Sequence, residues 1–573
     1  MIRRLVSFIA HFLFWLSSLP GTFRFFVSAR NSESAQRKIL SRIIKGNSNT
    51  EFGIKNSFAS IKTPEDFQTL VPVRTYEDFL PFIESVARGS KKILTDEEVR
   101  LFEPTSGSSS SSKLIPYTTG LKEDFRKGLD PWIFSLYFGH PELFGGSVYW
   151  SITPSHSEKR YTESGIPVGF AKDQEYFGGI QKWVLDTIMA VPSEVKNIKE
   201  IADFRYCTLL FLVSRRDLRL ISVWNPTYLS LLLKDLETLF SEIISDFNSG
   251  RISRLEGVDE ETRGILERRL RISSGRIREL EAVRKRRHGL ELLENSDSGR
   301  NLYEEIWPEL KVISCWCDGN AEYQVGEIKK MFSRAEIQPK GLLSTEALVS
   351  FPFFGEYSLL SVNSHFFEFE EWDGNPGKQK FFPAHQLQKG KQYKVVVTTN
   401  GGLYRYALGD IVEICDFWKK VPVMRFVGRS DKVVDLVGEK LNEILAERFV
   451  GETLKKFDIS PLFWMVAPQK LDLGCYRYTL FMELRDFVEK DILVKLAEAI
   501  DGKFKENYHY RYARILGQLS GLGLFLIDSK NGESAGEIFI KTSYRLGQQL
   551  GSIKNARLHR YEDWAKEFSG IIL

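Results

Sequence analysis

The sequence changes its pattern at Val395, where helix-like spacing gives way to short β-rich stretches. Before this point, residues 38–88 and 251–294 place apolar side chains at intervals of three to four residues, which predicts helices. After it, stretches such as KVVVTT, DIVEIC and VMRFVG are separated by Gly-Gly and Gly-Asp turns, which predicts a sheet or a small barrel. Because both patterns occur in one chain, we expect an α/β fold of the mixed α+β kind.

A polar break at Arg429-Ser430-Asp431 is the predicted boundary between a larger and a smaller part of the chain. Strand-like and helical stretches alternate again beyond it, as in a separate small domain. The chain has 573 residues, of which 43% are hydrophobic, and is therefore large enough for two or more domains. We expect an apolar N-terminal helix over residues 1–25, a large domain over 26–429 and a small domain over 430–573.

The charge balance and the cysteines narrow the class of function. Lys plus Arg number 79 against 75 Asp plus Glu, which gives no support for a protein that binds nucleic acid mainly through its phosphates. The five cysteines are sparse, odd in number and lack the paired spacing of a structural zinc site. Such cysteines suit a reducing cytosol, so we expect a cytoplasmic protein that acts on small molecules and has no nucleic-acid partner. We also expect a monomer.

The N-terminus carries two arginines before an apolar stretch that runs from Leu5 to Leu19. Three interpretations stay open: a helix packed on the body of the protein, a basic amphipathic helix on a membrane surface, and a cleaved signal peptide. The stretch is short for a membrane span, contains His11 and serines, and is followed by a poor cleavage site. We expect packing on the body, with contact of residues 1–20 with a membrane surface as the alternative.

The segment TSGSSSSSKLIPYT, residues 105–118, combines glycine and hydroxyl residues with a lysine. Small residues let a backbone turn tightly enough to aim several N–H groups at one anion, while hydroxyl groups and a lysine add donors and charge. A serine-rich surface loop is the alternative, and the segment lacks the Gly-Lys-Ser/Thr of a Walker loop. The apolar pair and proline that follow lead into a helix start, which favours a phosphate-binding loop held between ordered elements.

Three later segments place charged side chains where a nucleotide can be bound. Glu346 follows two hydroxyl residues, where a carboxylate is suited to Mg²⁺ beside a phosphate; a common surface glutamate is the alternative. Asp410 follows a glycine at the mouth of a predicted strand, where it can accept both hydroxyl groups of a ribose; a simple turn aspartate is the alternative. Arg429, Asp431 and Lys440 lie around the domain boundary, where one domain can deliver charge to a nucleotide held by the other.

The order of these segments resembles that of the adenylate-forming enzymes. Within them, the chain resembles the auxin-responsive, Gretchen Hagen type, acyl-acid amido synthetases and their bacterial relatives, from about Lys38 to the C-terminus. The resemblance rests on NTEFG, YEDFLPFI, TSGSSSSSKLIPYT, WNPTYLSLLL, IWPELKVISCWCDGN, LLSTEA, FFEFE, GGLYRYALGD, FVGRSDKVVDLVGEKLNE and GSIKNARL. Each segment is modest alone, and their shared order identifies the family.

The resemblance implies a large N-terminal domain of sheets, a small β-barrel and helices, with a smaller mobile α/β C-terminal domain. It implies an ATP- and Mg²⁺-dependent ligase that adenylates a carboxylic acid and transfers the acyl group to an amine, expected to be an amino acid, with release of AMP and pyrophosphate. An acyl-CoA ligase with the same adenylate chemistry is one alternative. A non-catalytic relative that binds nucleotide or membrane is another.

The resemblance also assigns residues to the nucleotide by position. They are Thr105, Ser106, Gly107, Ser108, Ser109, Lys113, Thr345, Glu346, Asp410, Arg429 and Lys440. Glu346 is expected at the metal and Asp410 at the ribose, while Lys440 and Lys554 are the expected catalytic cations. The chain departs from its relatives in the serine-rich loop and at Ala407, where a longer side chain is frequent.

The acyl acid is expected to bind in the large domain, along FRYCTLLFLVSR and SVWNPTYLSLLL. Trp224 and Tyr228 are the candidate substrate contacts, although apolar and aromatic residues on such helices also form cores. An indole, benzoate, jasmonate-like or fatty acid is compatible with such a pocket. No covalent enzyme nucleophile is required, and the sequence shows neither a Gly-x-Ser-x-Gly elbow nor an evident Cys-His pair.

Overall fold

The computed structural model describes most of the chain. The described residues are 2–105, 113–151, 160–169, 179–255, 257–291, 301–318, 322–354, 358–372, 380–430, 433–434, 436–437, 439, 441–471, 476–528, 533–548 and 553–573. Residues 106–109, Asp431 and Lys440, which the sequence analysis selected, lie outside the described residues.

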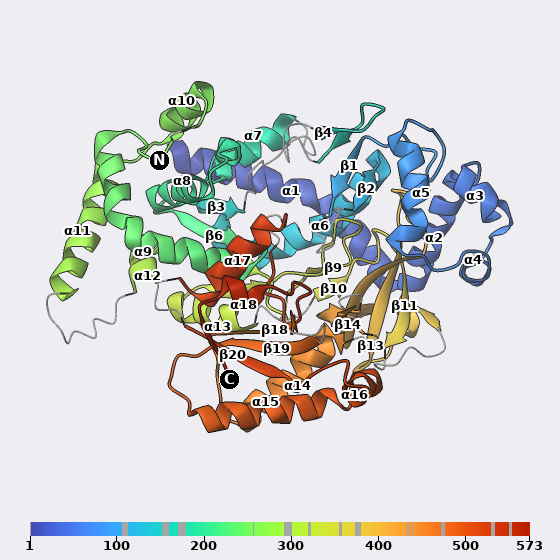
Figure 1. The fold of residues 1–573 in the computed structure, drawn as a ribbon. Coiled ribbons are helices and arrows are strands. Elements are labelled where there is room, and N and C mark those ends of the chain that lie inside the picture. The colour runs from blue at the N-terminus through green and yellow to red at the C-terminus, as the bar shows by residue number, and fades with distance from the viewer. Residues whose placement is uncertain are drawn as a thin grey trace. The chain divides into compact units, whose positions relative to one another are not determined.

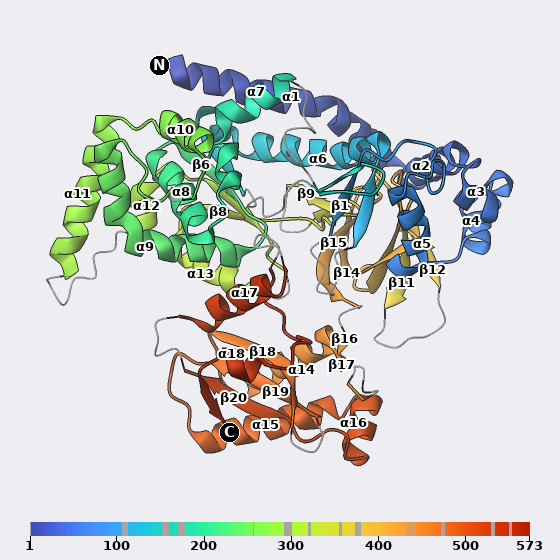
Figure 2. The same ribbon diagram turned by 45° about the horizontal axis from the view of Figure 1, so that its top comes forward.

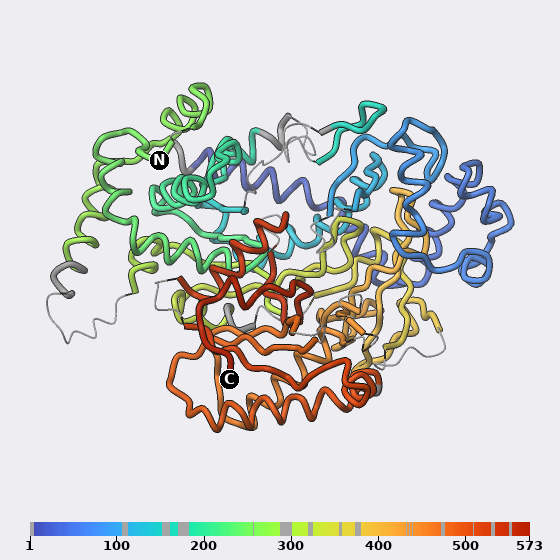
Figure 3. The backbone as a smooth tube through the Cα atoms, in the orientation of Figure 1, coloured from blue at the N-terminus to red at the C-terminus, as the bar shows by residue number. Residues whose placement is uncertain are grey.

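The chain divides into two compact units, and each is described by itself. The first consists of Met1–Leu408 and Glu413–Arg425, and the second of Gly409–Val412 and Phe426–Leu573. Figures 1 and 2 show their helices and strands in two views, and Figure 3 follows the backbone. The mixed α/β fold predicted from the sequence is confirmed, while the three-part division into domains stays a prediction.

The N-terminal helix α1 (Ile2–Arg30) packs along α6 (Thr119–Gly139) in the first unit. On its inner face, the Nε2–H group of His11 donates to the carbonyl oxygen of Gly146 (2.8 Å), and Nδ1 accepts from the hydroxyl group of Tyr137 (2.7 Å). A carbonyl oxygen can only accept, so the neutral imidazole carries its proton on Nε2. Burial lowers the pKa of His11 to about 4, which keeps the ring neutral at pH 7.

By length and composition, the segment Leu5–Arg30 of α1 could cross a membrane. Its inner face, however, carries buried polar groups with partners in the first unit, such as Ser7, whose hydroxyl donates to the Gly146 carbonyl (3.0 Å). In lipid these groups would lose their partners. The structure therefore agrees with a helix packed on the body, as expected from the sequence.

The helices predicted over residues 38–88 and 251–294 are present. The first unit contains α2 (Ser32–Gly46), α3 (Glu51–Lys55), α4 (Pro64–Leu70), α5 (Tyr76–Ala87), α7 (Gly179–Ile188), α8 (Ile201–Ser214), α9 (Pro226–Ser249), α10 (Glu260–Arg269), α11 (Ser274–Glu291), α12 (Leu302–Ile306) and α13 (Glu322–Met331). Helix α4 starts with a capping box, because the Asp66 N–H donates to Thr63 Oγ1 (3.1 Å) and the Asp66 carboxylate accepts from the Thr63 N–H (2.9 Å).

A parallel sheet organises the helical part of the first unit. Its order is β3 (Ser147–Trp150), β6 (Leu218–Ser222), β7 (Val312–Cys315) and β8 (Glu336–Pro339). Alternate side chains point to opposite faces. Val148 and Leu220 pack with residues of α1, α6 and α7, whereas Tyr149 and Ile221 pack with residues of α8 and α9. Helices therefore cover both faces, as is usual for parallel sheets (Figure 2).

Two further sheets belong largely to the first unit. One has the order β2–β1–β5–β4 and the other β12–β11–β13–β14–β15–β10–β9. The strands are β1 (Leu101–Pro104), β2 (Leu114–Tyr117), β4 (Arg160–Tyr161), β5 (Pro167–Val168), β9 (Ser350–Pro352), β10 (Ser358–Leu360), β11 (Phe366–Trp372), β12 (Phe381–Pro383), β13 (Gln392–Thr398), β14 (Tyr406–Trp418) and β15 (Val421–Arg429). The β-rich stretches predicted after Val395 lie in β13, β14 and β15 of the seven-stranded sheet.

The second unit has its own core. Its strands are β16 (Val433–Val434), β17 (Leu441–Asn442), β18 (Phe463–Lys470), β19 (Tyr476–Glu483), β20 (Gly523–Ile527) and β21 (Gly570–Ile572), and its helices are α14 (Glu443–Lys456), α15 (Lys490–Phe504), α16 (Tyr508–Ile515), α17 (Ala535–Arg545) and α18 (Trp564–Glu567). Strands β18 to β21 form one sheet in chain order. Side chains of β19, including Leu480 and Met482, pack with residues of α14 and α15.

Candidate nucleotide site

The hairpin of β1 and β2 carries the predicted phosphate loop at its tip. Pro104 pairs with Leu114, and the Thr105 N–H donates to the Lys113 carbonyl oxygen (2.8 Å). The Leu114 N–H donates to the hydroxyl oxygen of Tyr76 (2.8 Å), and the Lys113 ammonium lies 5.4 Å from the centroid of the Tyr76 ring. The hydroxyl oxygen of Thr105 is buried without a hydrogen-bond partner among the described residues. Ordered strands therefore hold both ends of the loop.

Thr345 and Glu346 are the middle residues of a tight turn. The Ser344 N–H donates to the Ala347 carbonyl oxygen (3.0 Å), and the Ala347 N–H donates to Ser344 Oγ (3.1 Å). The Glu346 carboxylate accepts a hydrogen bond from the hydroxyl group of Tyr406 (3.1 Å) at the start of β14. The turn thus presents one carboxylate in a fixed direction.

Tyr117 joins the hairpin to this turn. Its hydroxyl group donates to the carbonyl oxygen of Thr345 (2.6 Å). Burial raises the pKa of Tyr117 well above its ordinary value, and the carboxylates of Glu103 and Glu346 raise it further. The hydroxyl group therefore stays protonated and remains a donor. The hairpin, the turn and the start of β14 meet within the first unit.

Asp410 lies inside strand β14, whereas the sequence analysis placed it at the mouth of a strand. The strand begins at Tyr406, which also pairs with Arg74, and the Ala407 N–H donates to the Arg74 carbonyl oxygen (2.9 Å). Asp410 is buried, with 3% of its surface exposed, and its Oδ1 accepts from the Arg429 Nη1–H group (3.2 Å). Two of the predicted nucleotide contacts are thus paired in the second unit.

Glu439 fixes the main chain immediately before Lys440. Its carboxylate is fully buried and accepts from the N–H groups of Leu436 (2.9 Å) and Val437 (2.9 Å), and the Tyr478 hydroxyl group also donates to it. Such a buried carboxylate with several donors holds a loop firmly. The sequence analysis did not select Glu439, although it stands in the GEK segment that contains Lys440.

The predicted residues fall into two groups. Thr105, Lys113, Thr345 and Glu346 belong to the first unit, whereas Asp410, Arg429 and Lys554 belong to the second. The Lys554 ammonium lies 5.7 Å from the centroid of the Phe426 ring. Tyr117 and Tyr406 were missed, because a tyrosine in an alternating strand gives no signal of its hydroxyl partner.

The described residues contain no group of three or more His, Cys, Asp or Glu side chains placed to hold a metal ion. A single carboxylate such as Glu346 nevertheless fits Mg²⁺, because this ion is usually bound by one or two carboxylates together with substrate phosphates.

The two candidate substrate contacts lie apart. Trp224 follows β6, and its ring centroid is 5.9 Å from that of Trp316. Tyr228 is buried in α9, and its hydroxyl group is 3.4 Å from that of Tyr149, on the face of the sheet covered by α8 and α9. Contact of either residue with a substrate stays a prediction.

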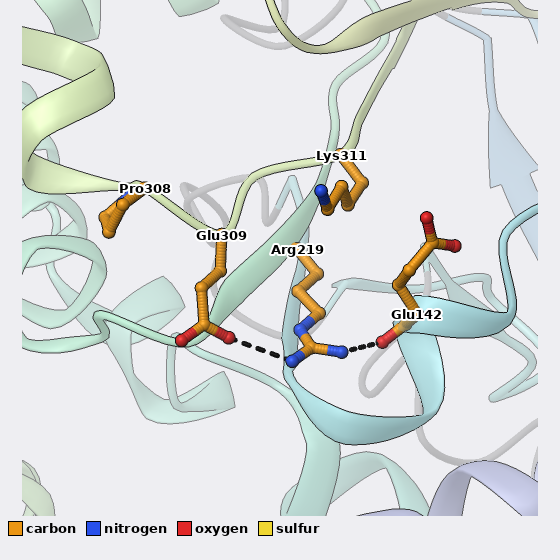
Figure 4. A pocket seen from close by; sticks show the side chains of 5 residues that line it. All are labelled: Glu142, Arg219, Pro308, Glu309 and Lys311. Atoms are coloured by element: carbon orange, nitrogen blue, oxygen red, sulfur yellow. Dashed lines mark hydrogen bonds and ion pairs between the residues drawn. The ribbon is translucent and has the colours of Figure 1, made fainter.

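A cavity of about 340 Å³ opens elsewhere in the first unit (Figure 4). It is lined by Glu142, Arg219, Pro308, Glu309 and Lys311. Arg219 pairs with Glu309 (2.9 Å) and donates to the Glu142 carbonyl oxygen. Arg219 and Lys311 stand at the amino-terminal ends of β6 and β7, whereas parallel sheets bind ligands at the carboxyl ends of their strands. We therefore assign this cavity no part in the site.

Comparisons with known proteins match most of the chain. The GH3 family N-terminal domain matches residues 24–337, and the GH3 family central domain matches residues 358–429. Indole-3-acetic acid-amido synthetase GH3.2 of Arabidopsis thaliana is 23% identical over 462 residues, which cover 75% of this chain and 79% of the relative. Jasmonoyl-L-amino acid synthetase JAR6 of Nicotiana attenuata is 23% identical over 507 residues, which cover 83% of each chain. The solved structure of AtGH3.15 acyl acid amido synthetase in complex with 2,4-DB shares the fold, with a TM-score of 0.79, 18% identity and 97% of each chain covered.

Proposed function

The chain belongs to the GH3 family, and on this premise we propose that it is an acyl-acid amido synthetase. It adenylates a carboxylic acid with ATP and transfers the acyl group to an amine, an amino acid, with release of pyrophosphate and AMP. The names of the relatives, which are amido synthetases of indole-3-acetic acid and of jasmonate, support this reaction class.

One arrangement supports the proposal best. Tyr117 and Tyr406 hydrogen-bond to Thr345 and Glu346, so the predicted phosphate loop and the predicted metal carboxylate are built into one framework of the first unit. The attack of a carboxylate on ATP brings two anions together. Hydrogen-bond donors and charges that are already held in place stabilise the transition state without having to reorient.

In the first half-reaction, a carboxylate oxygen attacks the α-phosphorus of ATP. A new P–O bond forms, the bond from the α-phosphorus to the bridging oxygen breaks, and pyrophosphate leaves. We assign the loop of residues 105–109 and Lys113 to the phosphates, and Thr345 and Glu346 to the nucleotide. Mg²⁺, when bound beside Glu346, neutralises phosphate charge.

We assign the remaining nucleotide contacts to the second unit. Asp410 is buried and suited to accept from the ribose hydroxyl groups, and Arg429 orients it through their hydrogen bond. Lys440 and Lys554 are proposed to supply positive charge to the phosphates. In the second half-reaction, the amine attacks the acyl carbon, the C–O bond to AMP breaks, and the amine loses a proton as the amide forms.

The test is a product assay on the full chain. Purified protein is incubated with ATP, Mg²⁺ and pooled carboxylic acids, with and without pooled amino acids and with coenzyme A, and products are identified by mass spectrometry. An amide together with AMP supports the proposal. A coenzyme A thioester as the sole product overturns it in favour of an acyl-CoA ligase.

We further propose a monomeric cytoplasmic enzyme that contacts membrane surfaces through the outer face of α1. The large apolar side chains that are more than a third exposed on this helix are Leu5, Val6, Phe8, Ile9, Phe12, Leu13, Leu16, Phe23 and Val27. The helix contains no acidic residue and four arginines, at positions 3, 4, 24 and 30. An apolar face with basic residues suits an anionic lipid surface.

Vesicle flotation tests this contact. The full chain is expected to float with vesicles that contain anionic lipid. The variant Phe12→Ser/Leu16→Ser/Phe23→Ser is expected not to float, because it loses apolar side chains that would enter the lipid. Its fold should be kept, since only residues of the outer face are changed. Equal flotation of both proteins would exclude the surface role of α1.

A further inference from the structure

A row of polar side chains crosses the parallel sheet at the carboxyl ends of its strands. The row consists of Trp150, Ser222, Ser314 and Gln338, which are paired in register. Paired residues of a parallel sheet point to the same face, and here it is the face that packs on α6, because Val148 and Leu220 stand two residues before Trp150 and Ser222. Open α/β sheets bind ligands at this edge.

A second row of side chains lies two residues beyond the first row, just after three of these strands. Trp224 follows β6, Trp316 follows β7 and Lys340 follows β8. Trp132 of α6 covers the same place, since its Nε1–H group donates to Gln338 Oε1 (3.1 Å). The three indole rings and the lysine therefore stand around one point beyond the ends of the strands.

Lys340 is the centre of this cluster. Its ammonium group lies 4.7 Å from the centroid of the Trp224 ring and 5.0 Å from that of Trp132, and it donates to Ser222 Oγ (2.7 Å). The residue is 9% exposed. No Asp or Glu among the described residues forms an ion pair with it, and burial lowers the pKa of Lys340 to about 8. A buried ammonium group without an anion is costly, so an anionic ligand would stabilise it.

Two further polar atoms of the first row are unused. Ser314 Oγ and Trp150 Nε1 are buried and have no hydrogen-bond partner among the residues that the structure describes. Ser314 is fully buried in the sheet, next in register to Ser222. Buried polar groups normally have partners. Because Ser314 stands next to the serine that Lys340 contacts, its unpaired hydroxyl group indicates a ligand with acceptor oxygens.

We propose that Lys340, walled by Trp132, Trp224 and Trp316, binds the carboxylate of the acyl substrate, and that this substrate has a planar or extended apolar body. The inference rests on the proposed function, because it names the substrate class of the same reaction. The ammonium group and the Ser314 hydroxyl are the donors available to the carboxylate oxygens. The indole faces suit an aromatic or alkyl body rather than a polar one.

Binding of acids in the absence of ATP tests the inference. Phenylacetate, indole-3-acetate and decanoate are titrated into the full chain, each beside its neutral amide, with tryptophan fluorescence and calorimetry as readouts. At least one acid is expected to bind at least ten times more tightly than its amide. Its affinity is expected to fall about tenfold per pH unit above pH 8, as the lysine loses its proton.

Lys340→Met is expected to lower the affinity for that acid at least tenfold, while Lys311→Met, a lysine at the opposite ends of the strands, leaves it unchanged. Ser314→Ala gives a milder test that keeps the lysine, with an expected loss of several-fold. Equal affinity for acid and amide, unchanged affinity in a folded Lys340→Met variant, or Lys340-dependent binding of free amino acids instead would overturn the inference. Acid binding without AMP formation would refute the proposed function and leave this site standing.

Discussion

The hydroxyl group of Tyr117 donates a 2.6 Å hydrogen bond to the carbonyl oxygen of Thr345, and this bond joins segments 228 residues apart. It connects the hairpin of the phosphate loop to the turn that carries Glu346. The two elements must keep their spacing if they act on one nucleotide.

Tyr117→Phe is expected to lower the rate of acid-dependent ATP–pyrophosphate exchange about tenfold. The variant leaves a carbonyl oxygen without its donor, a loss of about 1–3 kcal/mol for a buried group. Tyr161→Phe, at a tyrosine that is 58% exposed, serves as the control and should retain full activity. Full exchange activity in Tyr117→Phe would show that the bond does not position the turn.

Glu346→Ala and Asp410→Ala are each expected to lower the rate of adenylate formation by a factor of about 100 or more, because each removes a major electrostatic contact. Circular dichroism should show an intact fold. Asp416→Ala changes an exposed carboxylate on the same strand as Asp410 and should leave exchange unchanged. Wild-type activity of Glu346→Ala or Asp410→Ala would count against its assignment.

Docking of α1 is expected to weaken in acid because of His11. Burial lowers its pKa from 6.5 to about 4, so the folded state binds its proton less well than the unfolded state. The stabilisation is therefore complete above pH 6.5 and is lost as the pH falls towards 4. Between pH 7.5 and pH 5 this group should remove about 2 kcal/mol from the free energy of unfolding.

Urea denaturation of the wild type and His11→Gln at both pH values measures this contribution. The difference in stability between the two proteins should shrink by that amount at pH 5. His509→Gln, at an exposed histidine, should change neither value. A difference that does not depend on pH would mean that His11 is not held neutral.

Arg405 and Glu368 form a buried ion pair that is expected to matter for stability. The Arg405 Nε–H group donates to Glu368 Oε2 (2.9 Å), and Nη1–H donates to the Val71 carbonyl oxygen (2.7 Å). Arg405→Met should lower the free energy of unfolding by about 3–5 kcal/mol, because it leaves a buried carboxylate unpaired.

The exposed pair of Arg425 and Glu413 provides the matched comparison (2.7 Å). Arg425→Met should lower stability by less than about 1 kcal/mol. The double variant Arg405→Met/Glu368→Met should recover part of the loss, since it removes the unpaired charge. Equal effects of the two single arginine variants would contradict the importance of burial.

The sequence by itself determined the local elements and the segments that bear chemistry. Helices over residues 38–88 and strands after Val395 follow from periodicity, turn residues and glycine, which act over a few neighbours. The sequence analysis placed Asp410 at the mouth of a strand, whereas it lies inside β14, because the pairing of that strand involves residues far away in the chain, such as Arg74.

Only the tertiary structure decided which side chains meet. Ser222, Ser314 and Gln338 stand in one row because their strands pair in register, and Lys340 becomes a buried cation because Trp132 of α6 and Trp224 enclose it. Register and helix packing are set by burying the apolar faces of the whole first unit together. No short segment contains that information, so the inner face of α1 and the lysine cluster could not be predicted from local pattern.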